Sequence, residues 1–172
     1  MTVKPFEAED VSYLEAWIYD ESYSDFFRDM LSLTKDQLKI YSYMKDGQAF
    51  MIRMDDDPKP IGFIVLYEFR AVSGNLKMAI LIDKDHQKKG LCFEAMRAAC
   101  EYAFFRMRYH KLIVEVVESN IELRRSCEKG GFALEAILHE ETNVDGKFVN
   151  VARLVMFKQD YEKRVQEGFY GS

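Results

Sequence analysis

The spacing of apolar residues changes along the chain, from helical near the N-terminus to short continuous runs, and then back to helical. Val11, Leu14 and Ile18 recur every three or four residues behind the acidic segment 7–10, which predicts a first helix. A short strand over Thr2–Phe6 is expected before it. Three compact apolar runs follow, and we expect them to be strands: Gln48–Met54, Ile61–Phe69 and Leu76–Ile82.

The clearest helix is predicted over Gly90–Arg108, where charged residues form one stripe and nearly every other position is apolar. A second helix is expected to begin at the N-cap residue Asn120 and to end at Gly130–Gly131. A third is opened by the capping pattern of Thr34 and Gln37 and is expected to run to about residue 45. The rest of the chain predicts three strands and a turn: Lys111–Glu118, Phe132–Glu141, the turn Asp145–Gly146, and Phe148–Phe157.

This order of elements predicts the α/β (α+β) class, with a sheet that carries helices on its faces. The sequence contains no internal repeat and no Pro- or Gly-rich linker, so we expect a single domain over residues 1–172. Hydrophobic residues make up 48% of the chain, which is enough for a domain of this length to bury its own core.

Charge is distributed unevenly over the chain. Residues 1–60 hold 13 Asp and Glu against 7 Lys and Arg, a net charge of −6, while residues 61–172 hold 16 against 17, a net charge of +1. The acidic first third argues against nucleic acid as a partner, because phosphate binding needs a basic surface. It suits a cationic ligand; a solvated acidic surface that aids solubility is the alternative for any single carboxylate.

The cysteines and the N-terminal residues bear on location. Cys92, Cys100 and Cys127 are odd in number and scattered, which is typical of reduced thiols. The first residues carry no secretory signal, and no run approaches the roughly 18 apolar residues that a membrane span needs. We therefore expect a cytoplasmic protein with no membrane partner.

One segment predicts a bound anion. Gln87–Cys92 (QKKGLC) lies between a predicted buried strand and the start of the long helix. A turn at this place leaves backbone N–H groups without helical partners at the positive end of the helix dipole, where a pyrophosphate fits. Gly90 permits close approach of the backbone, and Lys88 and Lys89 add positive charge. The segment is neither a Walker loop nor a Rossmann fingerprint.

This segment resembles the acetyl-coenzyme A loop of the GNAT superfamily of N-acetyltransferases, whose pattern is Gln/Arg-x-x-Gly-x-Gly/Ala after a central strand. Glu115–Asn120 (EVVESN) and Glu128–Phe132 (EKGGF) are similar to the elements that follow this loop in the superfamily. The closing stretch, with 145–147 and 153–161, is similar to the last hairpin of the branch that contains ribosomal-protein N-terminal, spermidine and amino-sugar acetyltransferases. The resemblance covers residues 60–162 well and the first third only in layout.

The resemblance implies a mixed, mostly antiparallel central sheet flanked by helices, with acetyl-coenzyme A in a split between central strands. It implies that the loop wraps the pyrophosphate and that the backbone around residues 81–83 holds the pantetheine arm. It also implies that the start of the helix capped by Asn120 contacts the cofactor. The residues that it assigns to the cofactor are Leu81, Ile82, Asp83, Gln87, Lys88, Lys89, Gly90, Leu91, Cys92 and Asn120. Asn120 can act as a plain N-cap at the same time.

Three positions depart from the family pattern. Cys127 stands where many members carry a tyrosine that protonates the departing thiolate, and Lys77 occupies a strand position where polyamine-acetylating relatives often carry glutamate. Cys92 stands where Gly or Ala is usual. We interpret Cys92 as a small packed residue, with a thiol pKa lowered by the helix terminus as the alternative.

Glu115 and Cys127 are the candidate catalytic residues. Glu115 interrupts an otherwise apolar strand, and a carboxylate there must be paired, hydrated or functional, so it is the preferred general base. A structural hydrogen-bonding role is the alternative, and Glu118 at the strand end is a second candidate base. Cys127 is either a weak acid near the cofactor sulfur or a residue that fills space.

The acceptor side is expected to be aromatic and acidic. Trp17, Tyr19, Asp20 and Tyr23 are the candidate substrate-binding residues, because carboxylates attract an ammonium and aromatic faces can stack on it or on a sugar. The three histidines show no metal spacing with the cysteines, so we expect no metal.

We therefore expect an N-acetyltransferase that moves the acetyl group of acetyl-coenzyme A to a primary amine by direct attack on the thioester. The acceptor stays open between an amino sugar, a polyamine and a protein N-terminus, with a slight preference for an amino sugar, and a homodimer is compatible with this function. The missing tyrosine motivates an alternative, a catalytically silent GNAT-fold module that binds coenzyme A as a sensor or interaction protein. An acidic adaptor with a coincidental turn at Gly90 is a third interpretation.

Overall fold

The computed structural model describes residues 1–23 and 47–170 of the chain. These residues form one seven-stranded sheet in the order β1-β2-β3-β4-β5-β7-β6. Neighbouring strands are antiparallel except β4 and β5, which run parallel. The strands are β1 (Thr2–Pro5), β2 (Gly47–Arg53), β3 (Pro60–Arg70), β4 (Asn75–Ile82), β5 (Lys111–Val117), β6 (Ala133–Val144) and β7 (Lys147–Phe157).

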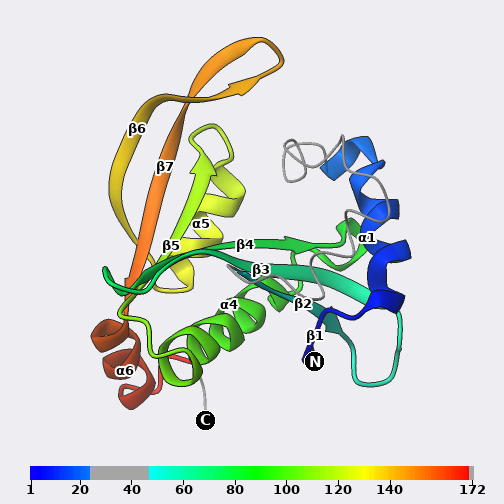
Figure 1. The fold of residues 1–172 in the computed structure, drawn as a ribbon, viewed down its shortest axis with the longest axis horizontal. Helices are drawn as coiled ribbons and strands as arrows, with labels where there is room; N and C mark the ends of the chain where they lie inside the picture. The colour runs from blue at the N-terminus through cyan, green and yellow to red at the C-terminus, as the bar shows by residue number, and fades with distance from the viewer. Residues whose placement is uncertain (24–46, 171–172) are drawn as a thin grey trace.

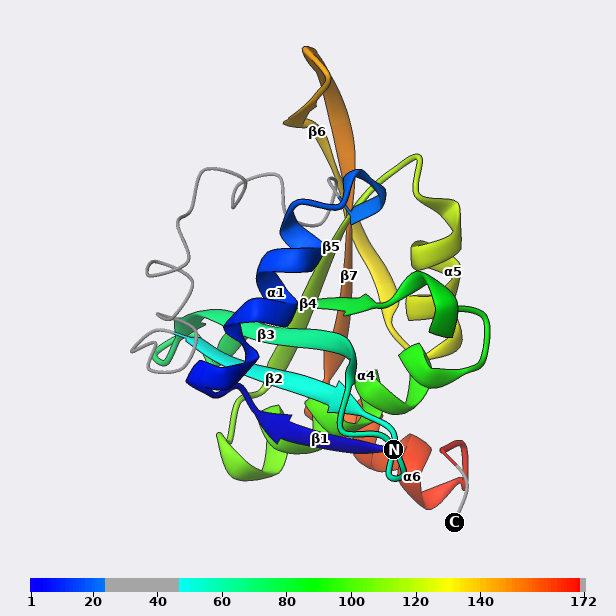
Figure 2. The same cartoon turned by 90° about the vertical axis from the view of Figure 1, so that its right-hand side faces the viewer.

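Helices cover both faces of the sheet (Figures 1 and 2). The long helix α4 crosses one face together with α5 and α6, and we call this the α4 face. The opposite face carries α1 and is called the α1 face. The helices are α1 (Val11–Ile18), α4 (Leu91–Glu101), α5 (Ile121–Lys129) and α6 (Lys158–Gln166), with short 3-10 turns η1 (Ala8–Asp10), η2 (Glu21–Tyr23) and η5 (Lys84–His86).

Alternation along β4 separates two hydrophobic cores. Leu76, Met78, Ile80 and Ile82 are buried in the core of the α4 face. Leu81 belongs to the core beneath α1. Successive side chains of a strand point to opposite faces, so every second residue of β4 contributes to the same core. The same rule places Lys77 on the α1 face.

A split opens in the middle of this sheet. The parallel strands β4 and β5 pair only over Asn75–Lys77 and Lys111–Ile113. Beyond these residues the two strands diverge, as Figure 1 shows. The second half of β4 and the second half of β5 therefore form the two walls of an opening, and the chain between them includes the turn at Gly90 and helix α4.

The structure confirms the strands expected from the sequence and corrects the extent of one predicted helix. The predicted helix over Gly90–Arg108 is α-helical only to Glu101 and continues as a π-helical turn over Tyr102–Arg106. This wider turn keeps Ala103 and Phe104 buried while the chain bends towards β5, and Arg108 adopts a left-handed φ of 62° at the bend.

Helix α6 was not predicted, because it gives almost no hydrophobic signal. Its nine residues bury a single side chain, Tyr161, and the others are polar or partly exposed. The helix predicted from Thr34 and Gln37 lies outside the described residues.

Candidate active site

The loop after η5 is built to present main-chain amides. Lys88 and Gly90 both adopt left-handed backbone angles, with φ of 61° and 80°. Within residues 1–23 and 47–170, the amides of residues 88–92 donate no hydrogen bond to the protein. A Cβ added to Gly90 would meet no atom within 4 Å, so glycine is needed here for its φ and not for space. Free amides at a helix start form an anion site, which fits a diphosphate.

Gln87 and Lys88 position this cofactor loop (residues 87–92). The Gln87 side chain donates from Nε2 to the carbonyl oxygen of Ile82 at 2.9 Å, which ties the loop to the end of β4. Lys88 Nζ lies 3.7 Å from the carboxylate of Glu122 in the first turn of α5. The side chains of Lys88 and Glu122 are both about 80% exposed, so this ion pair contributes little to stability. The contact does show that the cofactor loop lies beside the N-terminus of α5.

The backbone of β4 on the split side is only partly where the sequence placed it. The Asp83 amide donates to Ile61 of β3 at 2.8 Å, and alternation then directs the backbone groups of Leu81 to β3 as well. The backbone groups of Met78, Ile80 and Ile82 face the split instead. Of the expected residues 81–83, Ile82 alone presents its backbone there, and its carbonyl already accepts from Gln87. Met78 and Ile80 were missed because the strand register cannot be read from one sequence.

Asn120 is the N-cap that the sequence predicted. Its Oδ1 accepts a hydrogen bond from the Leu123 amide at 3.1 Å, at the start of α5. This satisfies one of the free amides of the helix N-terminus. The side-chain NH₂ group is not used in this bond, so contact of Asn120 with the cofactor stays a prediction.

A charged cluster of four residues crosses the α1 face where the split begins, formed by Glu68, Lys77, Glu115 and Arg153. Glu115 accepts hydrogen bonds at one oxygen from Arg153 Nε at 2.9 Å and Nη2 at 2.6 Å. Its other oxygen lies 3.1 Å from Lys77 Nζ, which also donates to Glu68 at 2.9 Å. Lys77 lies at the end of the paired part of β4, and Glu115 lies on β5 just beyond its paired part.

These contacts bear on the expected role of Glu115 as a general base. Burial pushes the pKa of Glu115 up, but hydrogen bonds from Arg153 and Lys77 outweigh it and hold the pKa below its usual value. A carboxylate with both oxygens paired and a lowered pKa is a weak proton acceptor. The geometry therefore favours the structural ion-pair alternative, and the catalytic role of Glu115 stays a prediction. Glu118, the second candidate base, is partly buried and accepts from Asn150 Nδ2 at 2.9 Å.

The cysteines near the cofactor loop are packed. Cys127 is fully buried, and burial raises the pKa of its thiol to about 12. A thiol of that pKa is a poor proton donor to a departing alkyl thiolate, since even the free cysteine thiol has a pKa of about 8.5, so burial favours the space-filling interpretation of Cys127. Burial also raises the pKa of Cys92 to about 11, opposite to the lowering considered from the sequence and consistent with a packed residue.

The expected acceptor wall is partly buried. Trp17 and Tyr23 are 7% and 6% exposed and belong to the core beneath α1. Both donate hydrogen bonds to the carboxylate of Asp83, which the resemblance had assigned to the cofactor. Tyr19 is 63% exposed, and Asp20 bonds to Ser22 and Lys84. The structure thus links three of the predicted site residues and leaves Tyr19 at the surface; a role of these residues in substrate binding is a prediction.

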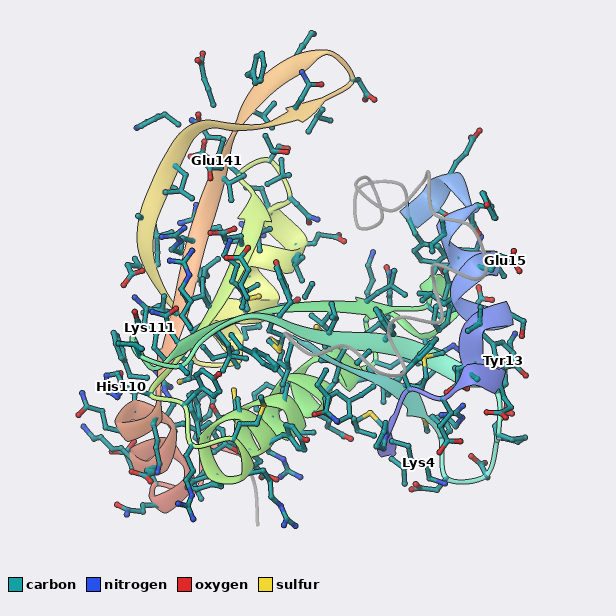
Figure 3. The ribbon with its side chains drawn as sticks, viewed as in Figure 1. Lys4, Tyr13, Glu15, His110, Lys111 and Glu141 are labelled. Atoms are coloured by element: carbon teal, nitrogen blue, oxygen red, sulfur yellow. The ribbon has the colours of Figure 1, made fainter. Side chains whose placement is uncertain are left out.

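The α1 face gives access to the split. On the α4 face, helix α4 and the core fill the space behind β4. On the α1 face, Lys77 and Glu115 retain 18% and Arg153 31% side-chain exposure, so solvent reaches the divergence. Figure 3 shows His110 and Lys111 at the closed start of β5, at the far end of the strand from the opening. Bound acetyl-coenzyme A supplies a thioester whose carbonyl carbon an amine can attack, and the amine can approach from the α1 face.

Within residues 1–23 and 47–170, no three His, Cys, Asp or Glu side chains gather so that they could hold a metal ion. None of the helices in the same part of the chain is long and apolar enough to cross a membrane.

Comparison with known proteins identifies the family of this chain. The acetyltransferase (GNAT) domain family matches residues 1–133. The spermidine N(1)-acetyltransferase of Escherichia coli strain K12 is 24% identical over 168 residues, which cover 92% of this chain and 87% of the relative. A probable N-acetyltransferase of Bacillus subtilis strain 168 is 30% identical over 117 residues, which cover 66% of this chain and 64% of the relative.

The fold agrees as well. The crystal structure of spermidine N-acetyltransferase from Vibrio cholerae in complex with coenzyme A and spermine matches with a TM-score of 0.86. The match covers 94% of this chain and 97% of that chain at 21% identity, which shows a shared fold. With the amide-lined loop, the split sheet and the family match together, the chain belongs to the GNAT acetyltransferase family and is an N-acetyltransferase that uses acetyl-coenzyme A.

Proposed function

We propose that the acceptor is a polyamine and that the enzyme acetylates one of its primary amines. The observation that carries this proposal is the extent of the similarity to the E. coli spermidine N(1)-acetyltransferase, which spans 92% of the chain. It therefore includes most of the acidic first third, whose net charge of −6 suits a ligand with several ammonium groups.

Carboxylates at the ends of the elements that border the split support a cationic acceptor. Asp20 lies 3.1 Å from the ammonium of Lys84, which comes just after β4, and Glu118 follows β5. Hydrogen bonds from the side chain and backbone of Ser22, and from Lys84, lower the pKa of Asp20 to about 2, so it is ionised at neutral pH.

The reacting amine must be neutral when it attacks. A primary alkyl amine resembles the lysine side chain, whose pKa is about 10.4, so presenting it neutral at pH 7 costs about 4–5 kcal/mol. Partial burial at the split disfavours the ammonium and lowers this cost. With Glu115 held in ion pairs, we expect catalytic efficiency to rise between neutral and mildly alkaline pH, as the fraction of free amine increases.

Lys77 and Arg153 support a second candidate, an amine that also carries negative charge, such as an amino sugar nucleotide. Both cations lie at the start of the split, and Lys77 stands where polyamine-acetylating relatives often carry glutamate. Their charges are balanced by Glu68 and Glu115, which weakens this candidate.

A thiol-release assay over a panel of amines tests the proposal. The panel contains spermidine, spermine, an amino sugar nucleotide and a peptide with a free N-terminus. We expect the highest catalytic efficiency with spermidine or spermine. A higher catalytic efficiency with the amino sugar nucleotide would replace the polyamine by the second candidate. The absence of thiol release with every amine would favour the coenzyme A sensor.

We further propose that residues 1–172 act as one cytoplasmic domain. The sheet draws its strands from residues 2 to 157, which supports a single folding unit. A homodimer is compatible with this proposal, and light scattering on the purified protein measures it.

A further inference from the structure

The side chain of Asp83 connects two parts of the molecule that lie far apart in the sequence. Asp83 follows the last residue of β4, and its Oδ2 accepts hydrogen bonds from Trp17 Nε1 at 3.0 Å and from the Tyr23 hydroxyl at 3.2 Å. Its Oδ1 accepts from the Asp85 amide at 3.0 Å. One carboxylate therefore binds the end of α1, the turn η2 and the turn η5.

Tyr23 makes a second connection between the same elements. Its hydroxyl donates to Asp83 and accepts from the Lys84 amide at 2.8 Å. Lys84 in turn extends its ammonium to within 3.1 Å of Asp20. Residues 17–23 are thus held to residues 83–85 by side chains of both segments.

The hydrogen bonds of Trp17 and Tyr23 with Asp83 are partly buried. Trp17 and Tyr23 are almost fully buried, and their rings pack in the core beneath α1. Burial pushes the pKa of Asp83 up, but the donors from Asp85, Trp17 and Tyr23 outweigh it and hold the pKa below its usual value. The carboxylate is therefore charged at neutral pH, and charge-assisted bonds of this kind are stronger than neutral ones.

One end of this connection lies beside the cofactor loop, and the other lies on the α1 face. On one end, Asp83 lies between Ile82, whose backbone faces the split, and the cofactor loop. On the other end, residues 17–23 form the end of α1 and η2 on the face from which an amine can reach the split (Figure 1). A shift of residues 83–86 on cofactor binding must therefore move the hydrogen-bond partners of Trp17 and Tyr23.

We propose that Asp83 and Tyr23 are positioning residues that couple the cofactor loop to the acceptor side, so that acetyl-coenzyme A and the amine strengthen each other's binding. Where binding at one site changes the affinity of the other, the change is the same factor in both directions, typically 5–150-fold. The coupling follows from the hydrogen bonds of Asp83 and holds for any acceptor amine.

Hydrogen exchange with and without coenzyme A tests the coupling without using an acceptor. In the wild type, coenzyme A is expected to slow exchange at residues 84–92 and also, by about 5-fold or more, at residues 17–23. Tyr23→Phe keeps the buried ring and removes the hydroxyl, so protection should persist at 84–92 and disappear at 17–23. Trp17→Phe removes the other donor to Asp83 and should weaken the transmitted protection in the same way.

Tyr161→Phe is the matched control. Tyr161 is also a buried tyrosine whose hydroxyl donates to a carboxylate, that of Glu101, at 3.2 Å, but it lies on the α4 face. Its loss should lower stability to a similar degree and leave the protection of residues 17–23 intact. Protection of 17–23 that persists in Tyr23→Phe, or that is absent in the wild type, overturns the proposal.

A binding measurement gives the size of the coupling and rests on the proposed polyamine function. The affinity for spermidine is measured by calorimetry with and without coenzyme A. Coenzyme A should tighten spermidine binding by about 5-fold or more in the wild type and in Tyr161→Phe. In Tyr23→Phe it should tighten spermidine binding by less than about 2-fold. Equal tightening in Tyr23→Phe contradicts the coupling. If spermidine does not bind the wild type, the polyamine proposal fails while the exchange experiment still decides the coupling.

Discussion

The cofactor loop and the charged cluster lie at the same split and are built on different principles. The loop offers main-chain amides of residues 88–92, which almost any side chain could present as long as Gly90 keeps its left-handed φ. The cluster offers side chains that pair with one another across β3, β4, β5 and β7. The difference teaches that the anion site depends on backbone shape, while the charge of the cluster depends on which side chains stand at four positions.

The largest effect is expected from straining the cofactor loop. Gly90→Val forces a β-branched residue into a left-handed conformation, at a cost of about 2 kcal/mol or more, so the affinity for acetyl-coenzyme A should fall about 30-fold or more. Gly168→Val is the matched control, since Gly168 also has a positive φ of 73° and an open surrounding. Calorimetry should show a loss of affinity only for Gly90→Val; equal affinity of both variants would contradict the role of the loop.

The next effect tests the charged cluster. Glu115→Gln leaves Arg153 without its charged partner, and we expect the free energy of unfolding to fall by about 1–2 kcal/mol, while turnover falls less than about 10-fold. Glu68→Gln removes the outer, more exposed carboxylate and should cost less. A turnover rate that drops by two orders of magnitude or more at unchanged stability would instead establish Glu115 as the general base.

The pH dependence of stability tests whether this ion pair stabilises the folded protein. The pKa of Glu115 is lower in the folded than in the unfolded protein, so the unfolded state binds the extra proton as pH falls. Its contribution is therefore complete above the unfolded pKa and is lost as pH falls through the lower folded pKa. Denaturant unfolding between pH 6 and pH 3 should show that the difference in the free energy of unfolding between wild type and Glu115→Gln shrinks as pH falls. A difference that grows would mean that Glu115 is not held ionised.

A smaller effect is expected at Cys127. Cys127→Ala removes a buried sulfur and should lower stability by about 1 kcal/mol, while the turnover rate stays within about 3-fold of the wild type. Cys100→Ala is the comparison, because Cys100 is equally buried in α4. The two variants should behave alike in a turnover assay. A large loss of turnover confined to Cys127→Ala would show that the thiol supplies a proton to the leaving group.

The smallest effect is expected at the rim of the loop. Lys88→Gln removes an exposed charge beside the anion site, and the affinity for acetyl-coenzyme A should fall about 2–3-fold at low salt. The difference should vanish near 1 M salt, because exposed charges are screened. A difference that persists at high salt would place the Lys88 side chain in direct contact with the cofactor.

The sequence predicted the fold well because its signals are local. The apolar run Leu76–Ile82, the cap at Asn120 and the turn at Asp145–Gly146 each determine their own element. The polar helix α6 left no such signal, because its buried face is one tyrosine. The π-helical turn after Glu101 depends on how the chain enters β5, which is a tertiary constraint.

The site was predictable at the cofactor loop, and less so along β4 and where it consists of paired side chains. The pattern from Gln87 to Cys92 was sufficient for the anion loop. That Glu115 is held by Lys77 and Arg153 depends on the order β4-β5-β7, which one sequence does not reveal. The same holds for Asp83, whose partners Trp17 and Tyr23 come from a much earlier segment of the chain.

The most direct test is a crystal structure of the protein with acetyl-coenzyme A bound. The diphosphate oxygens should lie about 2.7–3.2 Å from amide nitrogens of residues 88–92, with the pantetheine arm between β4 and β5. A diphosphate bound away from these amides, while the thioester still reaches the split, would contradict the assignment.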